Sequence, residues 1–324
     1  MASTKRLTAI PVLVLALYAA ACKESTTAPT VDPTAMATGV TGLNSTFSQN
    51  AVFQSLAALA SSFTLTAPVA RPLAGPMLAL FPVNVQGKVF QWDTAGGGKY
   101  RITDPALAGP ANGVRFILYQ VNSATGRPSL PLTTTGYVDL IDQSTLQANV
   151  LHVILKVGTQ TAADYTITQV LTTTTDTLGA TGFVADVVAG GAPVSFTLTH
   201  ALTLADSSLV TTYSASGSSA AVAMHTAYSG AGGSAVTLDW VLQKNGSVEV
   251  VGSSTPSALN FQFKLNGAAW ATVGGTPSAP TFTGASGRTL TAADLVAMGE
   301  ILQGFYNIAT DLGGVFGPAH LVFK

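Results

Sequence analysis

Residues 235–252 read AVTLDWVLQKNGSVEVVG, and this stretch decides the fold class. Before the turn, apolar side chains take alternate positions and polar ones lie between them: Val236, Leu238, Trp240 and Leu242 against Thr237, Asp239 and Gln243. Asn245-Gly246 then supplies a tight turn that requires positive φ. The stretch therefore predicts an antiparallel hairpin with one apolar and one solvated face.

The same alternation extends on both sides of this hairpin, from Val83 to Val273. It is clearest in VSFTLTHAL, which starts at Val194, and in LNFQFKLNG, which starts at Leu259. The links are of hairpin length, which favours an antiparallel meander over β-α-β units. Further strands are predicted at 87–93, 98–103, 113–121, 135–141, 149–157, 164–173, 181–188, 208–215 and 220–228.

A helix is predicted at 292–312. Thr291 to Asp294 reads as a capping box with Asp in place of Glu, and Gly313-Gly314 ends the pattern. Gly299 and Gly304 each cost about 1 kcal/mol relative to Ala inside a helix, which suggests close approach to a sheet. The closing residues HLVFK are strand-like. The apolar stripe contains Leu295, Met298, Leu302, Phe305, Ala309 and Leu312.

A second amphipathic helix is predicted at 45–63, with Asn44 or Ser45 as its N-cap. The four prolines that follow (Pro68, Pro72, Pro76 and Pro82) exclude regular helix up to Val83. The predicted fold is mainly β with some α: a large antiparallel meander sheet, curved or partly closed, whose apolar face is covered by the N-terminal and C-terminal helices.

The N-terminus is typical of a signal peptide. Lys5 and Arg6 precede an apolar run at 7–21 that ends in three alanines and contains Pro11. A transmembrane helix needs about 20 apolar residues, so we expect residues 1–21 to be removed.

Cys22, the only cysteine, directly follows these alanines. The arrangement resembles the lipobox of bacterial lipoproteins, although Ala19 stands where Leu is usual. The resemblance implies acylation of Cys22 by palmitate-type chains and a stable membrane anchor. By resemblance to the sorting rule of enteric bacteria, Lys23 implies the outer membrane. The alternative is ordinary A-x-A cleavage without lipid.

Residues 22–43 are rich in Thr, Pro and Ala, and we predict a flexible tether that reaches about 60 Å when extended. Residues 44–324 are long enough for a single β-rich domain.

Charged residues make up only 9% of the chain, against about 25% in typical soluble domains. Without Lys5 and Arg6, the 14 basic residues become 12 against 15 acidic ones, so the mature net charge is −3. This balance implies no nucleic-acid partner.

No catalytic, metal or cofactor site is predicted, and the chain is not expected to be an enzyme. The histidines lack metal-ligand spacing, and no G-x-S-x-G sequence is present. The glycine-rich runs at 96–99 and 230–235 link strands and are interpreted as turns.

Asp139 and Asp142 are interpreted as turn-formers. Trp92, Tyr100 and Tyr119 could stack on sugars, but core packing is the commoner role of sheet aromatics. The four histidines are His152, His200, His225 and His320.

Two further resemblances are limited. The run PANGVRFILY at 110–119, with Gly126-Arg127-Pro128 after it, is similar to segments of uncharacterised lipoproteins from environmental bacteria, over about a tenth of the chain, and it implies no activity. The predicted architecture resembles the unclosed barrels of periplasmic lipoprotein carriers, which hold acyl chains between sheet and helices. No motif residue carries over from either.

Three functions remain open. A binding or carrier lipoprotein would take a hydrophobic small molecule or a cell-envelope partner. A structural or surface scaffold lipoprotein would have a packed core. An integral outer-membrane β-barrel is opposed by the terminal Lys324, the two helices and the 8% aromatic content.

Overall fold

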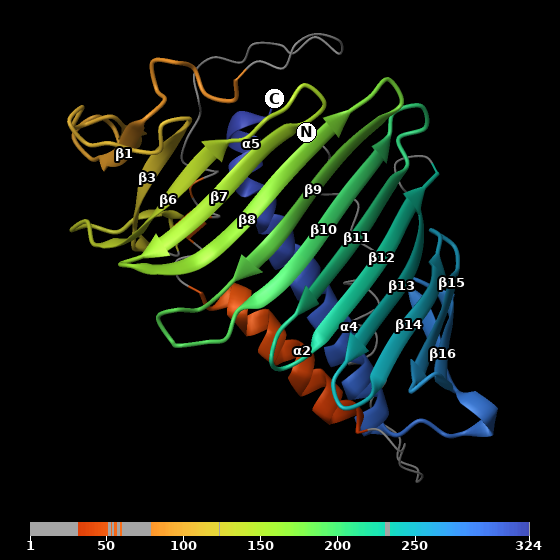
Figure 1. Cartoon of the computed structure of the whole chain (residues 1–324). Coiled ribbons are helices and arrows are strands. Elements are labelled where there is room, and N and C mark those ends of the chain that lie inside the picture. Colours follow the sequence, from red (N-terminus) through yellow and green to blue (C-terminus); the bar gives the residue numbers. More distant parts are fainter. Residues whose placement is uncertain are drawn as a thin grey trace. The chain divides into compact units, whose positions relative to one another are not determined.

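The computed structural model describes residues 32–50, Phe53, Ser55, Leu56, Leu59, 79–122, 124–230 and 234–323, and it is mainly β (Figure 1). Fifteen strands form one sheet in the order β17-β16-β15-β14-β13-β12-β11-β10-β9-β8-β7-β6-β3-β1-β2, and β4 pairs with β5. The strands are β1 (Lys88–Asp93), β2 (Lys99–Arg101), β3 (Gly113–Tyr119), β4 (Val121–Asn122), β5 (Arg127–Pro128), β6 (Thr134–Asp142), β7 (Asn149–Val157), β8 (Gln160–Leu171), β9 (Thr175–Val184), β10 (Val194–Thr203), β11 (Leu209–Ser216), β12 (Ala221–Ser229), β13 (Ala235–Gln243), β14 (Ser247–Ser254), β15 (Leu259–Leu265), β16 (Ala268–Thr276) and β17 (Ala279–Gly284).

The sheet is mixed, so the prediction of a purely antiparallel meander is wrong at one place. β1 pairs with β3 in parallel, with Lys88 opposite Val114. Parallel pairing is possible there because β2 and residues 102–112 carry the chain back to the end from which β1 started. β17 and β2 are the two edges, and the sheet is not closed.

The chain divides into two compact units, and each is described by itself below. Among the described residues, unit 1 comprises those up to Asn44 together with Leu198–Thr310. Unit 2 comprises Ser45–Thr197 together with Asp311–Lys324.

The hairpin of residues 235–252 lies in unit 1 as predicted. β13 and β14 pair antiparallel, with Trp240 opposite Val250. Asn245 and Gly246 have φ values of 51° and 143°, which confirms the predicted turn. The apolar side chains of β13 are buried and its polar ones are exposed, because successive side chains point to opposite faces of a strand.

Helix α4 (Ala292–Gly313) confirms the predicted C-terminal helix. The rings of Trp240 on β13 and Phe305 on α4 lie 5.3 Å apart between centroids, and both side chains are buried. Burying one such side chain contributes about 1.5–3 kcal/mol, so this contact fixes the helix on the sheet within unit 1.

The prediction that Gly304 approaches a sheet is corrected. Its neighbour is Val40 of helix α2 (Pro33–Ser48), whose methyl groups occupy the space that a Cβ on Gly304 would need. A helix therefore packs on a helix at this glycine, within unit 1.

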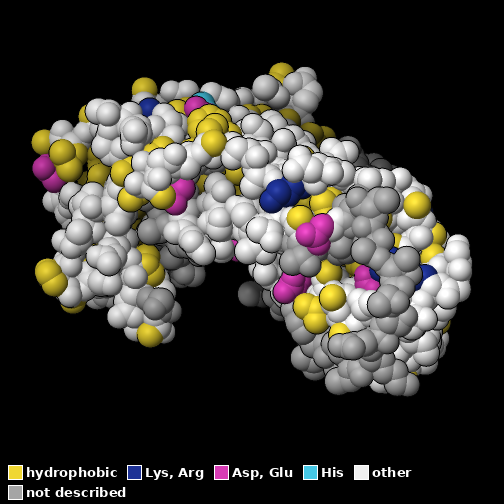
Figure 2. Space-filling model, turned by 90° about the horizontal axis from the view of Figure 1, so that it is seen from below, with side chains coloured by type: hydrophobic (Ala, Val, Ile, Leu, Met, Phe, Trp, Pro, Cys, Tyr) yellow, Lys and Arg dark blue, Asp and Glu magenta, His cyan; other side chains and the backbone are white. Residues whose placement is uncertain are grey.

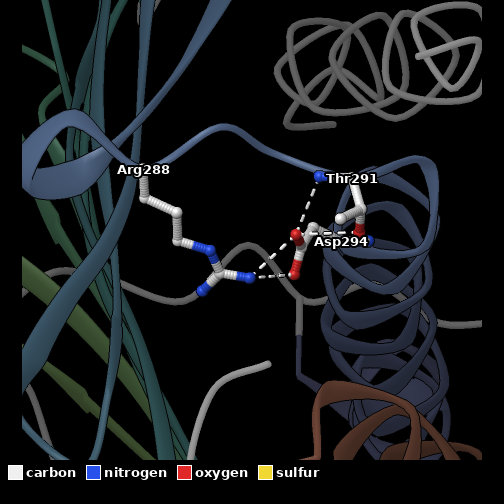
Figure 3. A network of polar contacts seen from close by, with 3 residues as sticks. All are labelled: Arg288, Thr291 and Asp294. Atoms are coloured by element: carbon white, nitrogen blue, oxygen red, sulfur yellow. Dashed lines mark hydrogen bonds and ion pairs between the residues drawn. The ribbon is translucent and has the colours of Figure 1, made fainter. Parts of the chain in front are cut away.

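A capping box starts α4, as predicted (Figure 3). The Thr291 N–H donates to Oδ2 of Asp294 over 2.9 Å, and the Asp294 N–H donates to Oγ1 of Thr291 over 3.1 Å. Arg288, which follows a short 3-10 turn (Ala285–Gly287), donates from Nη2 to both carboxylate oxygens of Asp294 over 2.7 and 2.8 Å. These bonds tie the loop after β17 to the first turn of the helix.

In unit 2, the C-terminal residues cover the sheet. A 3-10 turn (Gly314–Phe316) leads into helix α5 (Gly317–Val322), so the prediction of a closing strand at HLVFK is wrong. Pro318 lies in the first turn of α5, where proline favours a helix. Leu321 and Val322 of the same helix are buried. Tyr165 on β8 is fully buried, and its Oη donates to the Val315 carbonyl oxygen over 3.2 Å.

The N-terminal helix differs from the prediction. α2 begins at Pro33, so residues 33–43 are helical where the sequence analysis assigns a tether. Asp32 before Pro33 is a helix-start signal, and the buried stripe has a spacing of four, three and four: Met36, Val40, Leu43 and Phe47. The predicted helix at 45–63 is not confirmed as one element, because α2 already ends at Ser48 and nine of the nineteen residues lie outside the described part of the chain.

Candidate functional site

Cys22, the one predicted site residue, lies outside the described residues, so its acylation stays a prediction. Within the described ranges, no group of three or more His, Cys, Asp or Glu side chains is placed to hold a metal ion. No helix in the same part of the chain has both the length and the apolar character needed to cross a membrane.

The histidines have separate partners. On β7, Nε2 of His152 lies 2.7 Å from Oδ1 of Asp164, and its Nδ1 lies 3.3 Å from the amide nitrogen of Gln143. His200 contacts the hydroxyl of Tyr213 at 2.5 Å, and His225 contacts that of Thr212 at 3.4 Å. His320 is exposed at the end of α5. The three strand histidines thus contact residues of their own or neighbouring strands, and the four histidines do not converge on one site.

Asp139 and Asp142 also accept hydrogen bonds from described residues. Asp139 lies within β6 rather than in a turn, and it accepts two hydrogen bonds of 2.7 Å from Arg115. The hydrogen bonds from the guanidinium to Asp139 raise the pKa of Arg115, and the guanidinium lies 4.0 Å above the ring centroid of Tyr137. Asp142 follows the prediction of a loop-forming role, because it accepts the N–H groups of Leu80 and Ser144 over 2.7 and 2.9 Å.

The three candidate sugar-stacking aromatics are buried. Trp92, Tyr100 and Tyr119 are 8%, 7% and 7% exposed. The rings of Trp92 and Tyr100 pack edge to face, and the Tyr100 hydroxyl donates to the Ile117 carbonyl oxygen over 3.1 Å. Burial raises the pKa of Tyr100. Core packing is therefore confirmed for these side chains.

Among the residues that the structure describes, two hollows lie at the ends of strands, one in each unit. The hollow of unit 2 measures about 460 Å³ and is lined by Ala79, Gln86, Asn112, Asp142, Ser144, Thr145 and Leu146. Its polar groups already hold the surrounding loops: Ser144 Oγ accepts the Val150 N–H over 3.0 Å, and Gln86 donates to the Phe81 carbonyl oxygen over 2.9 Å. We assign it a structural role.

The hollow of unit 1 measures about 610 Å³, and we call it the turn hollow. It is lined by Gly217, Ser218, Ser219, Ala220, Ala221, Gln243, Lys244, Asn245, Gly246, Ser247 and Asn266. These residues belong to the β11–β12, β13–β14 and β15–β16 turns, which lie at one end of the sheet because alternate turns of a meander share an end. In Figure 1 this end is at the bottom, beside α2.

Most polar side chains that line the turn hollow form no hydrogen bond or ion pair with a described residue. Asn266 accepts the Ser247 N–H over 2.8 Å. Among the residues that the structure describes, no hydrogen bond or ion pair engages the side chains of Ser218, Gln243, Lys244 or Asn245. Since free polar groups around a hollow can bind a ligand, the turn hollow is the candidate binding site. From the sequence, Asn245-Gly246 is predicted as a turn, and none of the lining residues is predicted to bind a ligand.

Figure 2 shows one face of the molecule on which few Lys, Arg, Asp and Glu side chains lie among uncharged ones. No protein-family model, curated protein sequence or solved structure matches the chain.

Proposed function

We propose that the chain is a lipid-anchored protein of the bacterial cell envelope, whose β-rich body is a packed scaffold held close to the outer membrane. The anchor is supported by the sequence: the only cysteine follows the small residues at the end of an apolar signal segment.

The direct packing of helix on sheet is the observation that carries the scaffold part of the proposal. In unit 1, Trp240 and Phe305 are 3% and 0% exposed and in ring contact. In unit 2, Tyr165 donates to Val315, and these residues are 1% and 0% exposed. A carrier needs open apolar space between its helix and its sheet, whereas these side chains fill that space where they lie.

The start of α2 supports a short distance between body and membrane. Between positions 22 and 32 the chain spans at most about 36 Å when fully extended. The body would therefore stay within a few tens of ångströms of the bilayer, closer than a tether to residue 43 allows.

The test of the anchor compares the wild-type chain with Cys22→Ala in a bacterial host. The alanine variant keeps the small residues at 19–21, so ordinary cleavage can still release it. We expect the wild-type protein to stay with membranes through an alkaline wash and the variant to become soluble. A variant that resists the alkaline wash would contradict the anchor and favour an integral membrane protein.

The scaffold part is tested on the purified Cys22→Ala protein. We expect its organic extract to contain no lipid in a stoichiometric amount by mass spectrometry. A lipid recovered at one per chain, and in the same amount from the Lys244→Gln variant, would replace the scaffold proposal with carriage of a hydrophobic ligand.

A further inference from the structure

The charge of the turn hollow points to an anionic ligand. Among its eleven lining residues, Lys244 is the one cation and there is no Asp or Glu. The other polar side chains are hydroxyls and amides, which can donate hydrogen bonds without adding negative charge. In a chain with so few charges, an anion placed here meets one ammonium group and no lining carboxylate.

Lys244 differs from the ion-paired bases of the described chain. Lys264 lies 2.7 Å from Glu249, and Arg288 is held by Asp294. The ammonium of Lys244 forms no ion pair with any described residue. A half-buried lysine whose ammonium has no counter-ion among the described residues, beside free hydroxyl and amide groups, suits a phosphate oxyanion.

Helix α2 fixes the position of this lysine. A Cβ on Gly39 would lie 2.5 Å from Cδ of Lys244 and 3.5 Å from the Cβ of Ala220. A Cβ on Gly42 would lie 3.3 Å from the Cβ of Ser219. The two glycines therefore let the helix pack directly on the turns, so that the stem of Lys244 lies against α2.

The same helix relates the hollow to the membrane. From Pro33 to Gly39 a helix rises about 9 Å, and from Cys22 to Asp32 the chain spans at most about 36 Å. If Cys22 is acylated, as the proposed function holds, the turn hollow lies within reach of phospholipid headgroups.

We propose that the turn hollow binds the phosphate group of a membrane phospholipid. Lys244 contacts the phosphate oxygens through its ammonium group, and Ser218, Gln243 and Asn245 donate hydrogen bonds to the oxygens that remain. This inference rests on the proposed anchor for its source of ligand, and it gives the body a second, headgroup-directed contact with the membrane.

The experiment uses the full mature chain with Cys22→Ser, so that no acyl chain contributes. Flotation with phosphatidylcholine vesicles is compared with flotation with vesicles that also contain phosphatidylglycerol. We expect binding to the anionic vesicles, a loss of about tenfold or more with Lys244→Gln, and retained binding with Lys244→Arg, because only the glutamine variant loses the hydrogen bond from a charged donor to the phosphate. Lys99→Gln is the matched control, since Lys99 is an exposed base of unit 2, and it should bind like the parent.

Competition identifies the source of the phosphate. Glycerol phosphate at millimolar concentration should displace the protein from vesicles. Tight binding of inorganic phosphate together with no vesicle binding would overturn the lipid assignment, and equal binding by Lys244→Gln and Lys99→Gln would overturn the site. Neither outcome touches the anchor, because Cys22 is replaced throughout. If the natural chain proved to be unacylated, the same experiment would still show whether the turn hollow binds phosphate.

Discussion

Gly304 of α4 and Val40 of α2 approach so closely that a Cβ on Gly304 would overlap Cγ1 of Val40 and lie 2.8 Å from its Cγ2. Helix propensity alone predicts that Gly304→Ala stabilises the protein by about 1 kcal/mol. Because overpacking a core costs about 1–3 kcal/mol, we expect the clash to dominate and the free energy of unfolding to fall.

Gly313 provides the matched control in the same helix. It has helical φ and ψ, and a Cβ there would meet nothing within 4 Å. Gly313→Ala should therefore raise the free energy of unfolding by up to about 1 kcal/mol in urea denaturation. If both variants were stabilised, the close contact between the two helices would be wrong.

The sequence indicates that a glycine inside α4 needs an explanation, but it cannot identify the neighbour. Val40 lies more than 260 positions away, in a segment whose Thr and Gly residues obscure a four-residue apolar stripe. Asp32-Pro33 is a local signal for the start of α2, but the Thr, Pro and Ala content around it favours a tether.

The Arg288–Asp294 pair supports a prediction about the start of α4. The side chains of Arg288 and Asp294 are 19% and 5% exposed. Asp294→Ala removes the capping carboxylate and leaves a half-buried guanidinium without its partner, so we expect a loss of about 3 kcal/mol. Thr291→Val removes only the hydroxyl and should cost about 1 kcal/mol. Thermal unfolding measures both, and equal losses would contradict the role of Arg288.

Asp311 gives the protein a pH dependence. Burial raises the pKa of this carboxyl to about 6 from 3.8. The folded state therefore binds more protons than the unfolded state between about pH 4 and 6, and this residue lowers stability as pH rises through that window. Its side chain is only about half buried, so the effect is smaller than the shift alone implies.

Asp311→Asn should accordingly stabilise the protein at pH 7.5 and have little effect at pH 4, as measured by urea denaturation. Asp206 provides a control of opposite sign, because hydrogen bonds from Ser208 lower its pKa. Asp206→Ala should remove a stabilisation that is present at neutral pH and lost in acid. A variant of Asp311 whose effect did not change with pH would contradict its burial.

Lys23 makes the localisation testable. By resemblance to enteric sorting, the wild-type chain should reach the outer membrane and Lys23→Asp should remain in the inner membrane of an enteric host. Density-gradient fractionation separates the two membranes. Identical distribution of both proteins would remove the basis for the outer-membrane assignment.

Much of the sheet could be predicted from sequence because alternation along a strand is local. The strands from β6 to β8 and from β10 to β15, and the capping box at Thr291, follow from residues within a few positions of one another. The strand predicted at 181–188 overlaps only the end of β9. The parallel β1–β3 pair and helix α5 could not be predicted, because each depends on the folded structure: β1 pairs with the strand that follows β2, and α5 has Leu321 and Val322 buried in the folded chain.

The candidate site was missed for the same reason. Lys244, Ser218 and Asn266 belong to three separate turns, and only the order of the strands brings them to one end of the sheet. The positive-φ turn at Asn245-Gly246 was the signal available locally, and it indicates a hairpin without indicating a hollow.

Anchoring at Cys22 is the central claim, and the intact mass of the mature protein extracted from membranes tests it most directly. The account predicts a chain that starts at Cys22 and carries the added mass of two or three acyl chains, which alkaline hydrolysis reduces by releasing the ester-linked ones. A mature chain of unmodified mass, with a free thiol at Cys22, would contradict it.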